Sequence, residues 1–99
     1  MGWADNYIEK LRNGETVQFR PRGDSMTGKV NDGQLVTVVP AVTVEQGNVV
    51  LCKVNGRQYL HLVKAIGADG RFQIGNNKGF INGWTTKENV FGVVTSVED

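Results

Sequence analysis

The stretch NVVLCKVNGRQYLHLVKAI, residues 48–66, decides the fold. At its centre, Asn55-Gly56 is the dipeptide that most strongly favours a two-residue β-turn, because both residues tolerate the positive φ angles that such a turn needs. The segments on either side are apolar and contain several β-branched residues, which favour extended strands. The sequence therefore predicts a β-hairpin with strands at residues 48–54 and 57–66.

Short segments with alternating or β-branched patterns predict four further strands. They are residues 16–20, 35–39, 71–74 and 90–97, with a second hairpin turn at Ala68-Asp69-Gly70. At the start of the chain, Trp3, Tyr7, Ile8 and Leu11 recur at helical spacing, and Asn13-Gly14 suits a helix end, which predicts a short helix over residues 3–12.

Six short strands and thirteen glycines beside one helix indicate a mainly β fold. We expect a small, strongly curved, barrel-like domain with one short N-terminal helix. The 99 residues form a single domain, residues 1–99, with the helical segment at residues 1–14 and the β domain at residues 16–97.

Composition excludes several classes of protein. The chain is 39% hydrophobic and 21% charged, with a net charge of +1, which argues against a nucleic-acid binder. One cysteine and one histidine argue against a structural zinc site, and we expect no metal or other cofactor. No apolar run approaches the roughly 20 residues of a membrane span, and no signal peptide is evident. We expect no membrane partner and a cytoplasmic location.

The loop PRGDSMTGK, residues 21–29, carries the candidate chemistry. Gly23 to Lys29 fits a phosphate-loop pattern, but Val30 stands where Ser or Thr would hold magnesium. The Arg22-Gly23-Asp24 adhesion tripeptide lacks an extracellular context. The third interpretation is a nucleophilic Ser25 on a glycine-supported turn, with Met26 anchored in the core. A serine needs a base to act in this way, and otherwise Ser25 is an ordinary turn residue.

An ordered set of motifs resembles the superfamily of LexA-like and signal peptidase-like serine peptidases. The set consists of Gly23-Asp24-Ser25-Met26-Thr27-Gly28, then Asp32-Gly33-Gln34 with the strand at 35–39, then Gln46-Gly47-Asn48, then Tyr59–Val63, then Gly75-Asn76-Asn77, and finally Val90–Val94. The resemblance covers residues 16–97 and implies the β fold of that superfamily.

The resemblance also implies catalytic roles. Ser25 corresponds to the nucleophile, supported by a loop containing Gly23, Met26 and Gly28, and His61 takes the position of the family's lysine base. An imidazole is mostly neutral at pH 7 and can accept the serine proton. Alternatively, His61 is a satisfied core residue. Lys64, three residues further along the strand, is expected on the opposite face.

The third catalytic group is open at this stage. Asn76, Asn77 or Asp24 could orient His61. Gly75-Asn76-Asn77 resembles the Gly-Asp-Asn motif of signal peptidases, and those of the histidine branch use an aspartate near this motif. The asparagines 76, 77 and 82 could equally be plain turn residues. Trp84 is interpreted either as part of a specificity pocket on a loop or as a side chain packed over one end of the barrel.

We expect a serine endopeptidase that binds an extended peptide or protein substrate by strand addition. The alternative is a catalytically inactive peptidase-fold module that binds a peptide or protein partner. Gly28, Gln34 and Asn48 replace a proline and two aspartates of the family pattern. Gly28, Gln34 and the open identity of the third catalytic residue favour this alternative. The 24 residues before Ser25 contain no Ala-Gly or Cys-Gly dipeptide, which argues against a self-cleaving repressor. A homodimer through the N-terminal helix or an edge strand remains open.

Overall fold

The structure is a computed structural model that describes residues 2–99. In this range, one short helix precedes a single antiparallel sheet of seven strands. The elements are α1 (Asp5–Arg12), β1 (Val17–Phe19), β2 (Leu35–Pro40), β3 (Val49–Val54), β4 (Arg57–Ile66), β5 (Phe72–Gly75), β6 (Ile81–Thr85), the 3-10 turn η1 (Lys87–Asn89) and β7 (Val90–Glu98). The predicted mainly β fold with one short helix is confirmed.

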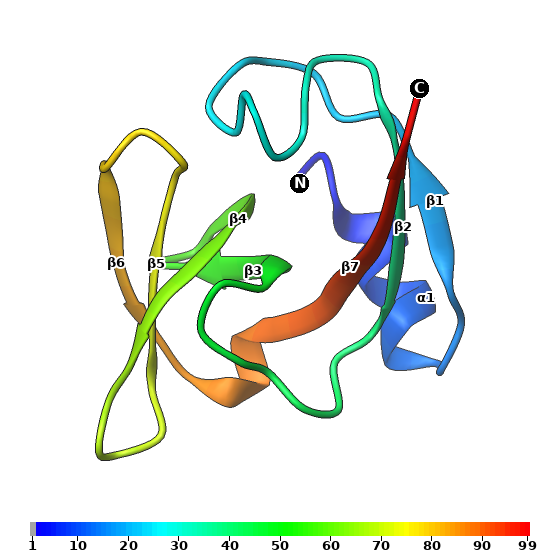
Figure 1. Ribbon diagram of the computed structural model, residues 1–99. Helices are drawn as coiled ribbons and strands as arrows, with labels where there is room; N and C mark the ends of the chain where they lie inside the picture. The colour runs from blue at the N-terminus through cyan, green and yellow to red at the C-terminus, as the bar shows by residue number, and fades with distance from the viewer. Residues whose placement is uncertain (1) are drawn as a thin grey trace.

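The sheet is strongly curved but does not close. Its strand order is β1-β2-β7-β3-β4-β5-β6, so β1 and β6 are the two edges. Figure 1 shows β5 and β6 on one side of the molecule, β1 and β2 with α1 on the other, and β3 and β4 between them. The predicted barrel is therefore only approximate, because closure would require β1 and β6 to pair.

Both predicted hairpins form. Asn55 and Gly56 have φ angles of 51° and 81°, the two positive values that a type I′ turn requires, and Val54 pairs with Arg57 across the turn. The resulting β3–β4 ladder runs without a register shift to the Val49–Leu62 pair. The hairpin between β4 and β5 closes with the Ile66–Phe72 pair. Local turn chemistry therefore fixes the centre of the sheet.

The structure differs from the sequence prediction at one strand, at Trp84 and at the start of the helix. Strand β6 was not predicted, because Asn82-Gly83 in its middle has the composition of a turn. Trp84 therefore lies on an edge strand rather than in a loop and is 42% exposed; its ring lies next to Gly67, in the turn between β4 and β5. Helix α1 begins at Asp5, so Trp3 precedes it; the indole Nε1 of Trp3 donates to the carbonyl of Gln58 at 3.4 Å.

The core lies on both faces of the sheet. Successive side chains of a strand point to opposite faces, and accordingly Leu51 of β3 belongs to one buried cluster whereas Val50 and Cys52 belong to another. Ile8 and Leu11 of α1 pack into the cluster that contains Leu51. By the same alternation in β4, Tyr59, His61 and Val63 share the face opposite to Leu60 and Leu62.

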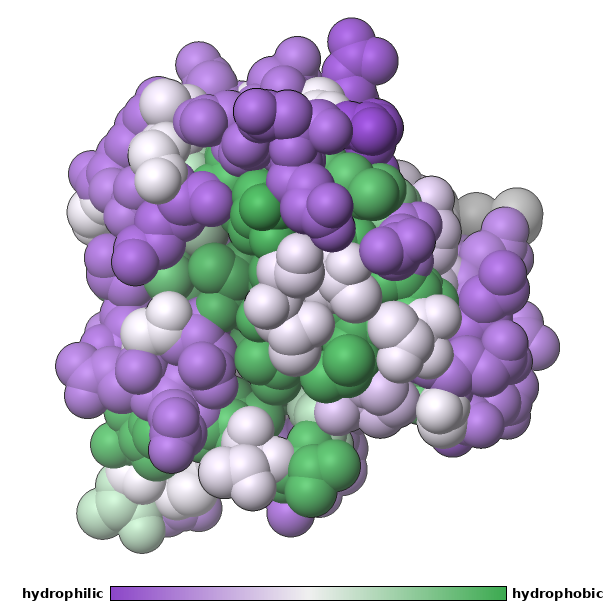
Figure 2. Space-filling view, turned by 45° about the vertical axis from the view of Figure 1, so that its right-hand side comes forward, coloured by the Kyte–Doolittle hydropathy of each residue, from purple (hydrophilic) through white to green (hydrophobic). Residues whose placement is uncertain are grey.

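The molecular surface combines apolar and polar regions. Figure 2 shows hydrophobic residues gathered in the middle of one face, with hydrophilic residues around them. Within residues 2–99, no helix is long and apolar enough to cross a lipid bilayer.

Candidate active site

The loop between β1 and β2 carries Ser25 and has no strand of its own. Met26 and Val30 are 4% and 3% exposed and fix this loop in the core. The N–H groups of Lys29 and Val30 donate to the carbonyl of Met26 at 2.9 and 2.8 Å, which closes a tight turn directly after Ser25. Met26 thus anchors the Ser25 loop in the core, as expected from the sequence.

Two glycines give this loop its shape. Gly23 and Gly28 have φ angles of 110° and 98°, in a region that residues with a Cβ rarely adopt. The N–H of Gly23 donates to Oδ1 of Asp32 at 2.7 Å, and the N–H of Gly28 donates to Oδ1 of Asn31 at 2.9 Å. Gly28, which replaces the family's proline, is therefore accommodated by a side chain–backbone turn.

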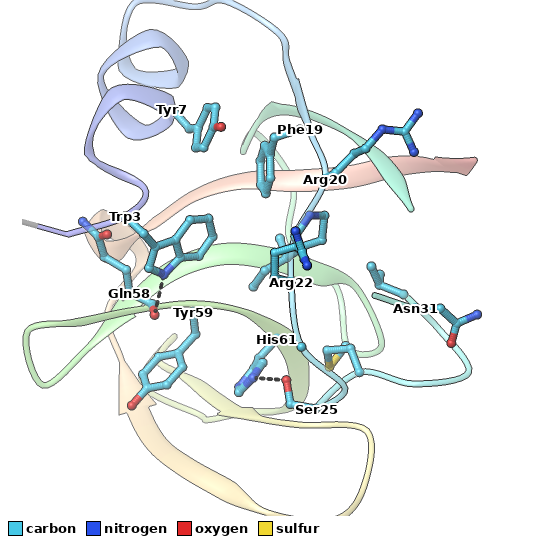
Figure 3. Close-up of a pocket in the computed structure, with 15 residues that line it drawn as sticks. Trp3, Tyr7, Phe19, Arg20, Arg22, Ser25, Asn31, Gln58, Tyr59 and His61 are labelled. Atoms are coloured by element: carbon cyan, nitrogen blue, oxygen red, sulfur yellow. Dashed lines mark hydrogen bonds between the residues drawn. The ribbon is translucent and has the colours of Figure 1, made fainter. Parts of the chain in front are cut away.

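Ser25 and His61 meet although they lie 36 residues apart. Oγ of Ser25 is 3.2 Å from Nε2 of His61, within hydrogen-bond distance. Ser25 is exposed at the mouth of a groove, whereas His61, in the middle of β4, is 9% exposed. Figure 3 shows the two side chains pointing toward each other from the loop and the strand.

The surroundings of His61 keep its imidazole neutral. Burial lowers the pKa of His61 below its ordinary value, because the charged form loses hydration; the hydrogen bond with Asn82 acts in the opposite direction and does not reverse the shift. The ring of Tyr59 stacks on the imidazole, with 5.0 Å between the centroids. At pH 7, His61 is therefore in the form that can accept a proton.

Asn82 holds the other side of the imidazole. Its Oδ1 lies 2.7 Å from Nδ1 of His61, and because a carbonyl oxygen can only accept, Nδ1 must carry the proton. In a neutral ring, Nε2 then has a free lone pair directed at the hydroxyl of Ser25. The amide of Asn82 thus selects the tautomer in which the Ser25 hydroxyl donates to His61.

A β-bulge brings Asn82 to this position. Between β5 and β6, Ile74 pairs with Gly83 but the next residue, Gly75, pairs with Ile81, so Asn82 is the extra residue. A bulge re-aims the side chain of its extra residue. Gly83, with φ 141°, supplies the backbone conformation next to it. A glycine inside an apolar segment is the one sequence signal that could have indicated this bulge.

The three residues predicted to orient His61 lie elsewhere. Oδ1 of Asn76 accepts the N–H groups of Lys78 and Phe80 at 2.8 and 2.9 Å and so shapes the turn between β5 and β6. The side chain of Asp24 is exposed, 3.9 Å from Nζ of Lys78. The side chain of Asn76 is thus engaged within its own turn, and that of Asp24 points to solvent. The structure places Asn82 in this contact instead.

Asn77 contacts the Ser25 loop rather than His61. Its Nδ2 donates to the carbonyl of Thr27 at 2.8 Å, and its N–H donates to the carbonyl of Ser25 at 3.3 Å. Figure 1 shows the Ser25 loop (cyan) and the turn that contains Asn77 (yellow) at the same end of the molecule. The prediction that Asn77 orients His61 is therefore replaced by a role in holding Ser25 in place.

Lys64 is committed to a structural contact. It is the extra residue of a second bulge, between the Val63–Ile74 and Ala65–Gln73 pairs, and its Nζ donates to the carbonyl of Asn76 at 3.1 Å. This leaves His61, and not Lys64, in contact with Ser25. Within residues 2–99, no group of three or more His, Cys, Asp and Glu side chains could hold a metal ion.

The sequence matches the model of one protein family. The profile of the Peptidase S24-like family matches residues 3–90, which is most of the chain. The chain belongs to the Peptidase S24-like family. The match includes both Ser25 and His61 and confirms the resemblance drawn from the sequence motifs. No curated protein matches the chain closely enough to serve as a named relative. The chain is thus a peptidase-fold domain of the S24 type.

Proposed function

We propose that this S24-like domain is a serine peptidase that hydrolyses a peptide bond, with Ser25 as nucleophile and His61 as general base. The observation that supports this most directly is the continuous chain of contacts from Ser25 Oγ through both nitrogens of His61 to Oδ1 of Asn82, at 3.2 and 2.7 Å. A nucleophile, a base and an orienting group in this order form the arrangement used for acyl transfer.

The proposed reaction has two halves. As Oγ of Ser25 attacks the carbonyl carbon, its proton moves to Nε2 of His61, and the imidazolium then protonates the leaving amine. A water molecule repeats these steps to release the acyl group. The backbone N–H of Ser25 has no hydrogen-bond acceptor within residues 2–99, so it is free to bind the oxyanion.

The edge of β4 next to His61 offers a place for the substrate main chain. β5 pairs with β4 only from Leu62 onward, so residues 57–61 have β3 as their one neighbouring strand. In this ladder the N–H of Val63 donates to the carbonyl of Asn48, the residue before β3. Successive residues of a strand direct their main-chain groups to alternate sides, so the even-numbered residues of β4 direct theirs away from β3. The N–H and carbonyl of Leu60 therefore face the groove, which supports binding of an extended peptide as an added strand.

A fluorophosphonate probe, which reacts with activated serines, tests the proposal. The chain contains only two serines, Ser25 and Ser96, so Ser96→Ala is a matched control. We expect the probe to label the wild type and Ser96→Ala, but neither Ser25→Ala nor His61→Ala. Absence of labelling in folded wild-type protein would refute the catalytic proposal.

The second candidate is a peptide-binding module without catalysis. Asn82 favours it, because a neutral amide fixes the tautomer of His61 but does not stabilise the imidazolium by charge, as a carboxylate would. In that case the groove binds peptides in the folded wild type while Ser25 stays unlabelled. Titration of a labelled peptide, run beside the probe experiment, separates the two functions.

A further inference from the structure

The groove beside Ser25 and His61 has an aromatic wall. The groove has a volume of about 420 Å³, and Trp3, Tyr7, Phe19 and Tyr59 line it. Tyr7 and Phe19 are stacked, with 4.3 Å between the centroids and 17° between the planes, and Trp3 meets Phe19 edge-on at 5.8 Å. Figure 3 shows Trp3 between this pair and Tyr59.

Trp3 is exposed and yet fixed in position. It is 53% exposed, while its Nε1 donates to the carbonyl of Gln58. The side chain of Gln58 binds the two residues that follow Trp3. It accepts from the N–H of Ala4 at 2.8 Å and donates to Oδ1 of Asp5 at 2.5 Å. A large aromatic ring held in place at the mouth of a groove, and left half in solvent, can contact a bound apolar side chain with little further loss of entropy.

The rim of the groove is positively charged. Arg20 and Arg22 line it, and no acidic side chain does within the described chain. Nη1 of Arg20 donates to the carbonyl of Gly33 at 2.8 Å, which positions its guanidinium without neutralising it. Arg22 contacts Asp32 at 3.4 Å, but both side chains are largely exposed, so this pair is weak and can exchange for a carboxylate of a ligand.

From this combination we propose that the groove selects peptides with a large aromatic or branched apolar side chain next to the scissile bond and an acidic residue close to it in sequence. The aromatic wall would contact the apolar side chain, and Arg22 would bind the carboxylate. This selectivity rests on the proposed peptidase function, because only then does the bound peptide contain a scissile bond.

Peptide binding to the Ser25→Ala protein tests the selectivity without hydrolysis. Four otherwise identical labelled peptides carry Phe or Ala at the apolar position and Glu or Gln at the neighbouring position. We expect the Phe–Glu peptide to bind most tightly, with about a tenfold loss for Ala in place of Phe. The Glu preference should weaken with added salt. Equal affinities of the four peptides for the folded protein would overturn the proposal.

Variants of the wall and the rim assign the effect to this groove. Trp3→Ala should abolish most of the preference for Phe, whereas Trp3→Phe, which keeps a ring, should retain part of it. Arg22→Gln should abolish the preference for Glu, and Arg57→Gln, outside the groove lining, should not. If Arg57→Gln alone removed the Glu preference, the assignment of the charge to the groove rim would be wrong.

The two proposals fail in different ways. Wild-type protein that reacts with the fluorophosphonate probe but binds all four peptides equally keeps the catalytic proposal and overturns the selectivity. Selective binding by Ser25→Ala, together with no labelling of the wild type, supports the groove as a recognition site and overturns the catalytic proposal.

Discussion

Replacing Asn82 with alanine removes the acceptor of the 2.7 Å bond from Nδ1 of His61 and leaves a buried N–H without that partner. Leaving a buried N–H without an acceptor costs about 1–3 kcal/mol. If that bond is needed for the tautomer that accepts the Ser25 proton, the rate of fluorophosphonate labelling should fall about 5- to 150-fold, because each 1.36 kcal/mol corresponds to a factor of ten.

The pH dependence of labelling distinguishes this role from general damage. The Asn82 bond raises the pKa of His61 against the effect of burial, so Asn82→Ala should lower that pKa further. Because only neutral His61 accepts the proton, the loss of rate on acidification should then occur at lower pH than in the wild type. Asn82→Asp places a carboxylate beside the ring, raises the pKa and should move the loss of rate to higher pH.

The assay is the second-order labelling rate measured between pH 5 and 9. Asn89→Ala is the control, because Asn89 lies in η1 and its Nδ2 donates to the hydroxyl of Thr86 rather than to a residue of the Ser25–His61 site. Identical pH profiles for wild type, Asn82→Ala and Asn82→Asp would show that the imidazole does not depend on Asn82, and the tautomer argument would be refuted.

Three further sets of substitutions test the burial of His61, the burial of Met26 and the backbone conformation of Gly83. Burial lowers the pKa of His61 in the folded state, so the unfolded chain binds more protons just below pH 6.5. The free energy of unfolding should therefore decrease as pH falls through 6.5. Denaturant titrations at pH 5 and 7.5 should show a smaller decrease in this free energy for His61→Gln than for the wild type. Met26→Ala should lower the unfolding free energy by about 2–5 kcal/mol through loss of a buried anchor, and an unchanged denaturation midpoint would contradict its burial. Gly83→Ala and Gly70→Ala should each cost about 1–3 kcal/mol of strain because of their φ angles of 141° and 84°. Only Gly83→Ala should also slow labelling, and equal labelling rates in these two variants would argue against the bulge as the device that positions Asn82.

The parts of the fold that were predictable are those with local causes. Asn55-Gly56 determines its own turn, and this turn sets the register of β3 and β4 and so places His61 in the strand. Strand β6 has no comparable local signal. It forms because β5 offers an edge for pairing, and this tertiary effect outweighs the turn preference of Asn82-Gly83.

The candidate site was predictable to the same extent. The resemblance indicated Ser25 and His61, and the structure brings them within hydrogen-bond distance. The orienting group could not be derived from spacing, because a residue in a bulge does not follow the two-residue alternation of a strand. Asn76 and Asn77 matched a motif in sequence, but the turn between β5 and β6 uses their side chains to hold itself and the Ser25 loop.

The bulge at Asn82 places an architectural constraint on how this family member can change. Deleting one residue from β6 would restore an uninterrupted ladder with β5 and turn the side chain at this position to the other face. His61 would then lose its hydrogen-bond acceptor. The irregular pairing of β5 and β6 is therefore the condition for the His61–Asn82 contact, and the length of β6 cannot change by one residue without losing that contact.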